Sequence, residues 1–404
     1  MPPTAEGFPL QPHRHARLAV VAGAGALAGT VALALPYGDW RMPALFVVGI
    51  LFGLTLYLTA FGFTGAYREL LVQRETGGAR AQLLLLAVTT VLFAPVLAAG
   101  SFLGREVAAA VAPVGVSVAS GAFLFGIGMQ LAGGCGSGTL YTMGGGSTRM
   151  ALVLAAFCGG SFIASFHMPW WSGLPAWGDI SLGEELGWPA AVALQLALLF
   201  VLWRVLRRIA PAGRGVRAAS FERASRQRML WAGALLLAVL SLLTLALAGH
   251  PWSITWAFTL WGAKTALLFG WDPATVEFWR GGFQANALAS GILDDVTSVM
   301  DIGIVLGALA GAGAAGRFAP RLSLSARSVA AALLGGLAMG YGARIAYGCN
   351  IGAFYSGVAS TSLHGWLWII AALPGCWVGV RLRPWFGLEQ RSGDRALPGS
   401  AVKS

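Results

Sequence analysis

Charged residues are scarce in this chain of 404 residues, at 11%, whereas hydrophobic residues make up 57%. A soluble protein needs more charge on its surface, so the composition excludes an ordinary globular enzyme. The core of a bilayer takes about 20 apolar residues per helix, and apolar stretches of that length occupy most of the chain. The sequence therefore predicts an all-α polytopic membrane protein with about 9 to 11 transmembrane helices, some of them short and broken or re-entrant.

The sequence also lacks the signatures of several common binding sites. Only four cysteines are present, none in a C-x-x-C pair, and no histidine stands at ligand spacing beside them, which excludes a disulfide framework and a zinc site. No Gly-Lys-Ser/Thr follows the glycine-rich run at Gly133, so nucleotide binding is excluded as well. The net charge of +11 is concentrated in a few loops, which argues against nucleic-acid binding. We expect no cofactor.

The basic loops predict an orientation. Loops rich in arginine stay in the cytoplasm, and three qualify: Arg68–Arg80, Arg204–Arg228 and Arg317–Arg327. The acidic, tryptophan-rich joint around Trp177 then belongs outside. Counting spans between these loops requires Trp252–Gly270 to enter the membrane and return. The predicted location is the inner, cytoplasmic membrane of a bacterium.

A glycine-rich stretch occurs twice, each time with one cysteine at its centre. The copies are Gly126–Gly138 and Gly340–Gly352, and both read G-x-G, an apolar run, Gly-Cys, then Gly. An odd number of spans separates equivalent points, which predicts an inverted repeat with helices interrupted near the midplane. The division expected is a tail with an extra span (1–40), a first repeat (41–187), linking spans with a basic cytoplasmic loop (188–250), a second repeat (251–385) and a disordered C-terminal tail (386–404).

The repeated cysteines are the main candidates for chemistry. A thiol flanked by glycines has space around the sulfur and backbone N–H groups that can face an anion. We expect Cys135 and Cys349 to line a path for a small solute. The residues expected to bind substrate with them are Gly134, Gly136, Gly348, Asn350, Gln130, Tyr347, Arg344 and Lys264. The neutral polar side chains among these residues are equally suited to hydrogen-bonding the backbone groups that a broken helix leaves free. Arg344 is equally suited to a structural ion pair.

Further polar and thiol groups lie inside or beside the apolar segments. Cys158 and Cys376 lie mid-span without polar neighbours, and helix packing is the favoured interpretation. Asp294, Asp295 and Asp301 cluster at the outer start of a span. There a solvated helix cap is favoured over a proton relay.

Several of these segments resemble the YeeE/YedE family of bacterial inner-membrane proteins. They are the two Gly-Cys motifs, Phe61–Arg68, Trp261–Lys264 and Tyr347–Gly352. The resemblance implies an inverted-repeat bundle with a narrow waist, transport of sulfur-containing ions such as thiosulfate, and waist cysteines that guide the ion by S–H contacts, at Cys135 and Cys349. One position departs: Gly62 stands where relatives commonly have a further cysteine.

The leading hypothesis is therefore a transporter or channel, not an enzyme, that imports thiosulfate or a related anion. A separate cytoplasmic sulfur-carrier protein would accept the product. The alternatives are a membrane thiol sulfurtransferase or disulfide exchanger, a transporter of a selenium compound, and a structural membrane partner of a soluble sulfur-handling protein.

Overall fold

A computed structural model gives the fold for residues 13–36, 38–210, 217–318, 320 and 323–388. In this part of the chain, 10 helices are long and apolar enough to cross a membrane. The prediction of an all-α polytopic membrane protein is confirmed. The first residues of the predicted N-terminal tail (1–12), most of the predicted C-terminal tail (389–404) and Arg214 of the long basic loop lie outside the described residues.

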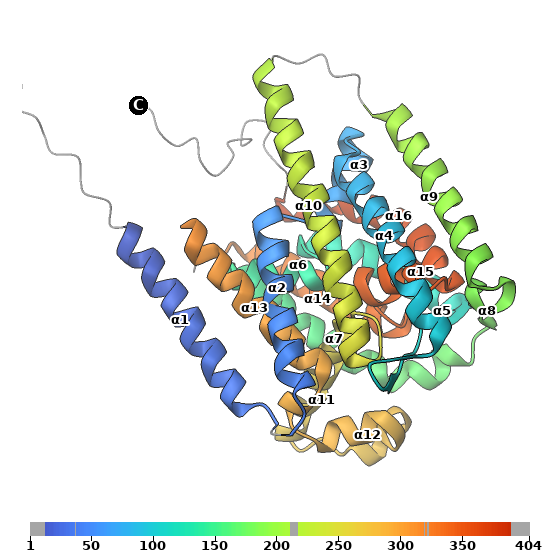
Figure 1. Cartoon of the computed structure of the whole chain (residues 1–404). Coiled ribbons are helices and arrows are strands. Elements are labelled where there is room, and N and C mark those ends of the chain that lie inside the picture. The colour runs from blue at the N-terminus through green and yellow to red at the C-terminus, as the bar shows by residue number, and fades with distance from the viewer. Residues whose placement is uncertain (1–12, 37, 211–216, 319, 321–322, 389–404) are drawn as a thin grey trace, which may run out of the picture.

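The helices alternate between long spans and short pieces (Figure 1). Up to the long basic loop they are α1 (His13–Ala34), α2 (Arg41–Thr59), α3 (Phe63–Gln73), α4 (Gly77–Ala99), α5 (Val116–Ala132), α6 (Gly136–Gly144), α7 (Thr148–Ser172), α8 (Leu182–Leu186) and α9 (Trp188–Ile209). After it come α10 (Arg217–Ala248), α11 (Thr255–Leu268), α12 (Gly282–Ala289), α13 (Val296–Ala315), α14 (Ala326–Ile345), α15 (Ser356–Ala359) and α16 (Leu363–Leu382).

Short elements fill the joints. A π-helical segment, η4 (Asn350–Tyr355), leads into α15, and 3₁₀ turns are η1 (Pro273–Thr275), η2 (Glu277–Trp279), η3 (Ile292–Asp294) and η5 (Arg383–Phe386). Strand β1 (Ser101–Phe102) pairs with β2 (Arg105–Glu106), and β3 (Pro113–Gly115) pairs with β4 (Ala176–Asp179), both antiparallel. Sequence analysis did not predict these strands.

Two predicted spans differ from simple crossings. The predicted span Pro43–Ala66 is two helices, because Ala60 takes a left-handed conformation (φ 50°) between α2 and α3. The segment Trp252–Gly270 contains only α11, which at 1.5 Å per residue is about 21 Å long, short of the roughly 30 Å bilayer core. It is not among the ten spanning helices, and α12 lies beside it at one end of the molecule (Figure 1), which agrees with a re-entrant segment.

The basic joints gather at one end of the molecule, the top in Figure 1. There α3 precedes α4, α9 ends, α10 begins and α13 ends. The opposite end carries α12 and the joint between α7 and α9 with α8. We call the end with the basic joints the inner end and the opposite one the outer end. The predicted sidedness of the basic and tryptophan-rich joints thus fits the arrangement of the helices.

The two helices that lead into the Gly-Cys motifs are antiparallel. Near the start of α5, the Ser117 hydroxyl donates a hydrogen bond to the carbonyl of Ile345, the last residue of α14 (2.5 Å). Near the other end, Arg149 donates from Nε to Ser328 at the start of α14 and from another nitrogen to the carbonyl of Leu131 at the end of α5. The two motifs therefore approach the centre from opposite ends, as the inverted repeat predicts.

Glycines let each motif helix pack closely on the outgoing helix of the other copy. A Cβ on Gly375 or Gly379 of α16 would meet the backbone of α5, at Phe123 and Ile127, and a Cβ on Gly336 or Gly340 of α14 would meet α7. In both pairs the residue numbers rise together, so α16 runs parallel to α5 and α14 parallel to α7. Small residues at such contacts let helix backbones approach within a membrane.

This packing predicts that Gly375→Ala destabilises the bundle. The new methyl group would overlap the carbonyl oxygen of Phe123, and overpacking of a filled interior costs about 1–3 kcal/mol. The measurement is the midpoint of thermal unfolding in detergent, followed by tryptophan fluorescence. The control is Gly159→Ala on α7, where the nearest atom is 3.9 Å from the added Cβ; this variant should match the parent or exceed it. Equal midpoints for the two variants would contradict the close contact.

Candidate functional site

The first motif is a broken helix with its cysteine at the start of the second piece. Helix α5 ends at Ala132, Gly133 takes a left-handed conformation (φ 82°), and Cys135 is the N-cap of α6. The Cys135 carbonyl accepts the Thr139 N–H (2.8 Å), and its Sγ lies 3.4 Å from the Ser137 hydroxyl. Because α6 starts here, the first free N–H groups of the helix surround the thiol.

The second motif repeats this geometry. After α14, Tyr347 and Gly348 have positive φ (57° and 153°), and Cys349 is the N-cap of η4. The Ile351 N–H donates to Cys349 Sγ (3.4 Å), and the Ala353 N–H donates to the Cys349 carbonyl (3.0 Å). Both cysteines thus occupy the N-terminus of a half-helix, where the helix dipole is positive and favours an anion.

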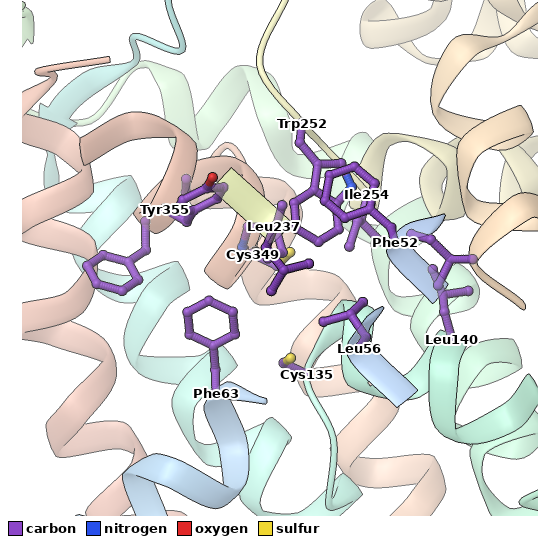
Figure 2. Close-up of a cluster of buried hydrophobic side chains, with 14 of the residues drawn as sticks. Phe52, Leu56, Phe63, Cys135, Leu140, Leu237, Trp252, Ile254, Cys349 and Tyr355 are labelled. Carbon is purple, nitrogen blue, oxygen red and sulfur yellow. Dashed lines mark hydrogen bonds between the residues drawn. The ribbon is translucent and has the colours of Figure 1, made fainter. Parts of the chain in front are cut away.

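The two thiols share one buried apolar cluster. Cys135 and Cys349 are almost completely buried, at 1% and 0% exposure, together with Phe63, Leu56 and Leu237 (Figure 2). A Cβ added to Gly136 would lie 3.3 Å from Cys349 Sγ, so the residue next to the first cysteine touches the second. The structure therefore brings Cys135, Gly136 and Cys349 together, as the repeat predicts.

A cavity of about 160 Å³ leads to only one of the thiols. Cys135 lines it, with Gly134, whereas Cys349 does not. At the inner end it reaches the ion pair between Arg226 and Glu69 (2.8 Å), in which Arg226 is well exposed. Toward the outer end Phe52 and Trp252 stack with ring centroids 3.9 Å apart, and both are fully buried. The site around the two thiols is thus approached from the inner end and covered by aromatic rings toward the outer end.

Buried polar atoms without partners gather near the two thiols. Both side-chain atoms of Asn350, Oε1 of Gln130 and the Tyr67 hydroxyl have no hydrogen-bond partner among the described residues. Tyr67 lies near Asn350, Cys135 and Cys376, and Gln130 lies near Cys376. A buried polar group without a partner is costly and needs a reason. Of these atoms, Nδ2 of Asn350 and the Tyr67 hydroxyl are donors, and they suit the oxygens of a small anion.

Tyr67 and Cys376 were not expected at the site. Tyr67 lies in the segment that carries the family resemblance, but its sequence position gives no sign that it reaches Asn350, which is far along the chain. The mid-span position of Cys376 favoured packing, and the thiol is fully buried. Sequence alone could have found neither, because the contacts join different repeats.

Two arginines that sequence analysis did not select hold the end of α5. Arg149 donates to the carbonyls of Leu131 and Ala132. Arg383 donates to the carbonyl of Gln130 (2.6 Å). They satisfy carbonyls that the helix end leaves free, and their positive charge complements the helix dipole. They fix the backbone from which the first motif departs.

The remaining predicted residues lie away from the cavity. Lys264 donates from Nζ to the carbonyls of Leu288 (2.9 Å) and Ser290 (2.5 Å), so it ties α11 to α12. The Arg344 guanidinium lies 5.3 Å from the centre of the Phe278 ring, with Tyr347 nearby. Neither cation lines the cavity, and Gly348 supplies the strained turn before Cys349.

Comparison with known proteins assigns the family. The family described as Sulphur transport matches residues 58–378, which include both motifs. The chain belongs to this family. Its described residues contain ten candidate membrane-spanning helices.

Named relatives in this family are transporters. The chain is 35% identical over 143 residues to the probable transporter YedE of Escherichia coli, a match covering 35% of each chain. It is 29% identical over 353 residues to the thiosulfate transporter TsuA of Spirochaeta thermophila, covering 82% of this chain and 96% of the relative. The TsuA of Escherichia coli is 26% identical over 362 residues, covering 84% and 94%. The chain thus spans about a third of the YedE proteins and nearly the whole of the TsuA proteins.

The cavity predicts the accessibility of a thiol at position 62. Gly62 lines the cavity, and a Cβ there would lie 3.2 Å from the Tyr141 hydroxyl. Gly62→Cys should therefore react with a small, membrane-impermeant thiol reagent added at the inner end and be protected from the same reagent added at the outer end.

The control is Asp179→Cys on the exposed strand β4, which should react only from the outer end. Sealed vesicles of both orientations and mass spectrometry of the modified peptide measure the result. Labelling of Gly62→Cys from the outer end alone would refute an inward-facing cavity.

Proposed function

We propose that this protein imports thiosulfate or a related sulfur-containing anion across the bacterial inner membrane through the constriction at Cys135 and Cys349. The observation that carries the proposal is the symmetric placement of the two thiols, each at the N-terminus of a half-helix and each buried. The names of the TsuA relatives support the substrate. A separate cytoplasmic sulfur-carrier protein would take up the anion at the inner end.

The contacts available suit a weakly hydrated sulfur atom joined to oxygens. A thiol can donate a weak S–H hydrogen bond to the terminal sulfur. The unpartnered Nδ2 of Asn350 and the unpartnered hydroxyl of Tyr67 can donate hydrogen bonds to the oxygens. Arg68 and Arg226 at the cavity mouth supply positive charge for the anion as it leaves. Arg344 and Lys264 act in this proposal as supports of the surrounding helices.

A covalent role for the thiols is the second class of function. A sulfurtransferase needs a base that generates the thiolate. The polar contacts of the two thiols among the described residues are Ser137 and the Ile351 N–H, and neither is a base. This favours non-covalent passage. Mass spectrometry after exposure to thiosulfate separates the two, because a persulfide on either cysteine would indicate the enzyme.

The proposal predicts the effect of removing each thiol. In proteoliposomes, Cys135→Ser and Cys349→Ser should each lower the initial rate of labelled thiosulfate uptake by about tenfold or more, corresponding to about 1.4 kcal/mol of lost stabilisation or more. The hydroxyl keeps the size of the site but is a poorer partner for sulfur.

The control is Cys158→Ser, a loss of a thiol outside the constriction, which should keep parental uptake. Excess unlabelled sulfate and selenite, added as competitors, test the choice of anion. Uptake at the parental rate in both Cys135→Ser and Cys349→Ser would show that the thiols do not lie on the transport path. Stronger competition by selenite than by thiosulfate would indicate that the substrate is a selenium compound.

A further inference from the structure

The carboxyl group of Asp301 is the most unusual buried group outside the constriction. Its side chain is completely buried, and both oxygens have no hydrogen-bond partner among the described residues. It lies on α13 about 9 Å beyond the N-cap residue Asp295, at 1.5 Å per residue, and so within the membrane. Ionisable side chains at such depth are expensive and mark functional sites.

The neighbouring acids behave as the helix cap expected from the sequence. Asp295 accepts hydrogen bonds from the Ser298 N–H (2.8 Å) and from Trp256 Nε1 (3.0 Å), and Asp294 accepts the Gly291 N–H (2.6 Å). Capping therefore accounts for these two carboxylates. Capping does not account for Asp301, because neither of its oxygens accepts a hydrogen bond from an N–H group of the described residues.

The face of α13 that carries Asp301 looks toward the constriction. One turn before it, Ser298 accepts a hydrogen bond from Trp261 of α11 (2.9 Å), and one turn after it, the Val305 carbonyl lies where a Cβ on Gly144 of α6 would be. Helix α6 is the half-helix that begins at Cys135. Asp301 is close enough to Cys349 and to Cys158 of α7 to act on both electrostatically.

The other charged and titratable groups on elements packed against α13 leave Asp301 unpaired. Those whose side chains are described are Arg17 of α1, Arg41 and Tyr57 of α2, Tyr141 of α6, Lys264 of α11 and Asp294 of η3. Arg41 donates to the carbonyl of Leu103. Arg17 lies at Gly316, the far end of α13, and Lys264 is bonded to two carbonyls. Among the described residues, the one ion pair joins Arg226 and Glu69.

We propose that Asp301 carries a proton inward with each anion, so that uptake is driven by the proton gradient. This inference rests on the proposed function. An unpaired carboxylate in a dry interior is far less stable than the acid, so the side chain holds its proton while the constriction is closed. A dianion beside Cys349 adds negative charge nearby and strengthens that hold. One proton is taken from water at the outer end and one is released to water at the inner end.

The outer end offers a route for the proton. Asp295 interacts electrostatically both with Asp301 and with His250. The Asp295 side chain is 8% exposed. Burial raises the pKa of Asp295, and burial lowers the pKa of His250. The raised pKa brings the proton exchange of Asp295 closer to neutral pH, and the lowered pKa keeps His250 as the neutral imidazole, which can accept a proton. These two groups connect the outer end to Asp301.

The test uses proteoliposomes containing the full chain and a trapped pH-sensitive dye. In the parent, thiosulfate added outside should acidify the interior, and an external pH one unit lower should raise the accumulation of labelled thiosulfate by up to about tenfold, the factor for one proton per anion. In Asp301→Asn, which keeps the shape without the proton, exchange of labelled for unlabelled thiosulfate should continue. Both the acidification and the response to the pH gradient should vanish.

The control is Asp179→Asn on exposed strand β4, which should behave as the parent. Parental uptake without acidification and without a response to the gradient would overturn proton coupling while leaving the proposed function intact. Absence of thiosulfate uptake by the parent would instead refute the proposed function. If Asp301→Asn fails to insert, the acidification measured with the parent shows whether uptake is coupled to protons. Asp301→Glu, which retains a titratable group, should then keep the response to the pH gradient. Proton coupling that persists in a folded Asp301→Asn protein would exclude this residue as the proton carrier.

Discussion

The structure depends on satisfying broken backbone inside a membrane. Where a helix stops midway, its free N–H and C=O groups have no water to pair with, so the protein itself must supply partners. Two helices stop in this way here, at Ala132 and Ile345. The Ile345 carbonyl is satisfied by Ser117 of the antiparallel helix, and the last carbonyls of α5 by Arg149 and Arg383. Each break is thus held at least in part by the other half of the chain, through Ser117 for α14 and through Arg383 for α5.

This mutual support explains why the interior is built so largely from glycine. The side of a broken helix that faces a partner must come close enough for side chains such as Ser117 and Arg149 to reach the free carbonyls. Contacts such as Gly375 on Phe123 and Gly340 on Phe157 bring the backbones together. Glycine weakens an isolated helix, but in a membrane it gains packing that a larger residue would prevent. The same closeness leaves the thiols little room and buries them.

The sequence was sufficient for the fold class, the paired breaks and the short re-entrant segment, because hydropathy, arginine loops and a repeated motif are local signals. It was insufficient for the partners around the site. Gln130 and Asn350 were selected as neighbours of the cysteines, whereas Tyr67 and Arg149 become relevant only when distant helices meet. Lys264 was expected to face the anion, and its ammonium instead binds two carbonyls of a neighbouring turn. A charged side chain in an apolar stretch shows that a polar partner is needed, and the fold determines which group that partner is.

The use of thiols in the proposed constriction follows from the cost of keeping it dry. Cys349 is enclosed with Phe63, Leu56 and Leu237, where a charged group would need a permanent partner or water. A thiol behaves as a small hydrophobic group when nothing is bound and still has a proton to offer a sulfur atom. The stronger attraction comes from the two half-helix N-termini, whose dipoles are fixed in the backbone and need no buried cation. In the proposed function, selectivity for a sulfur anion and closure against water are therefore compatible in one apolar site.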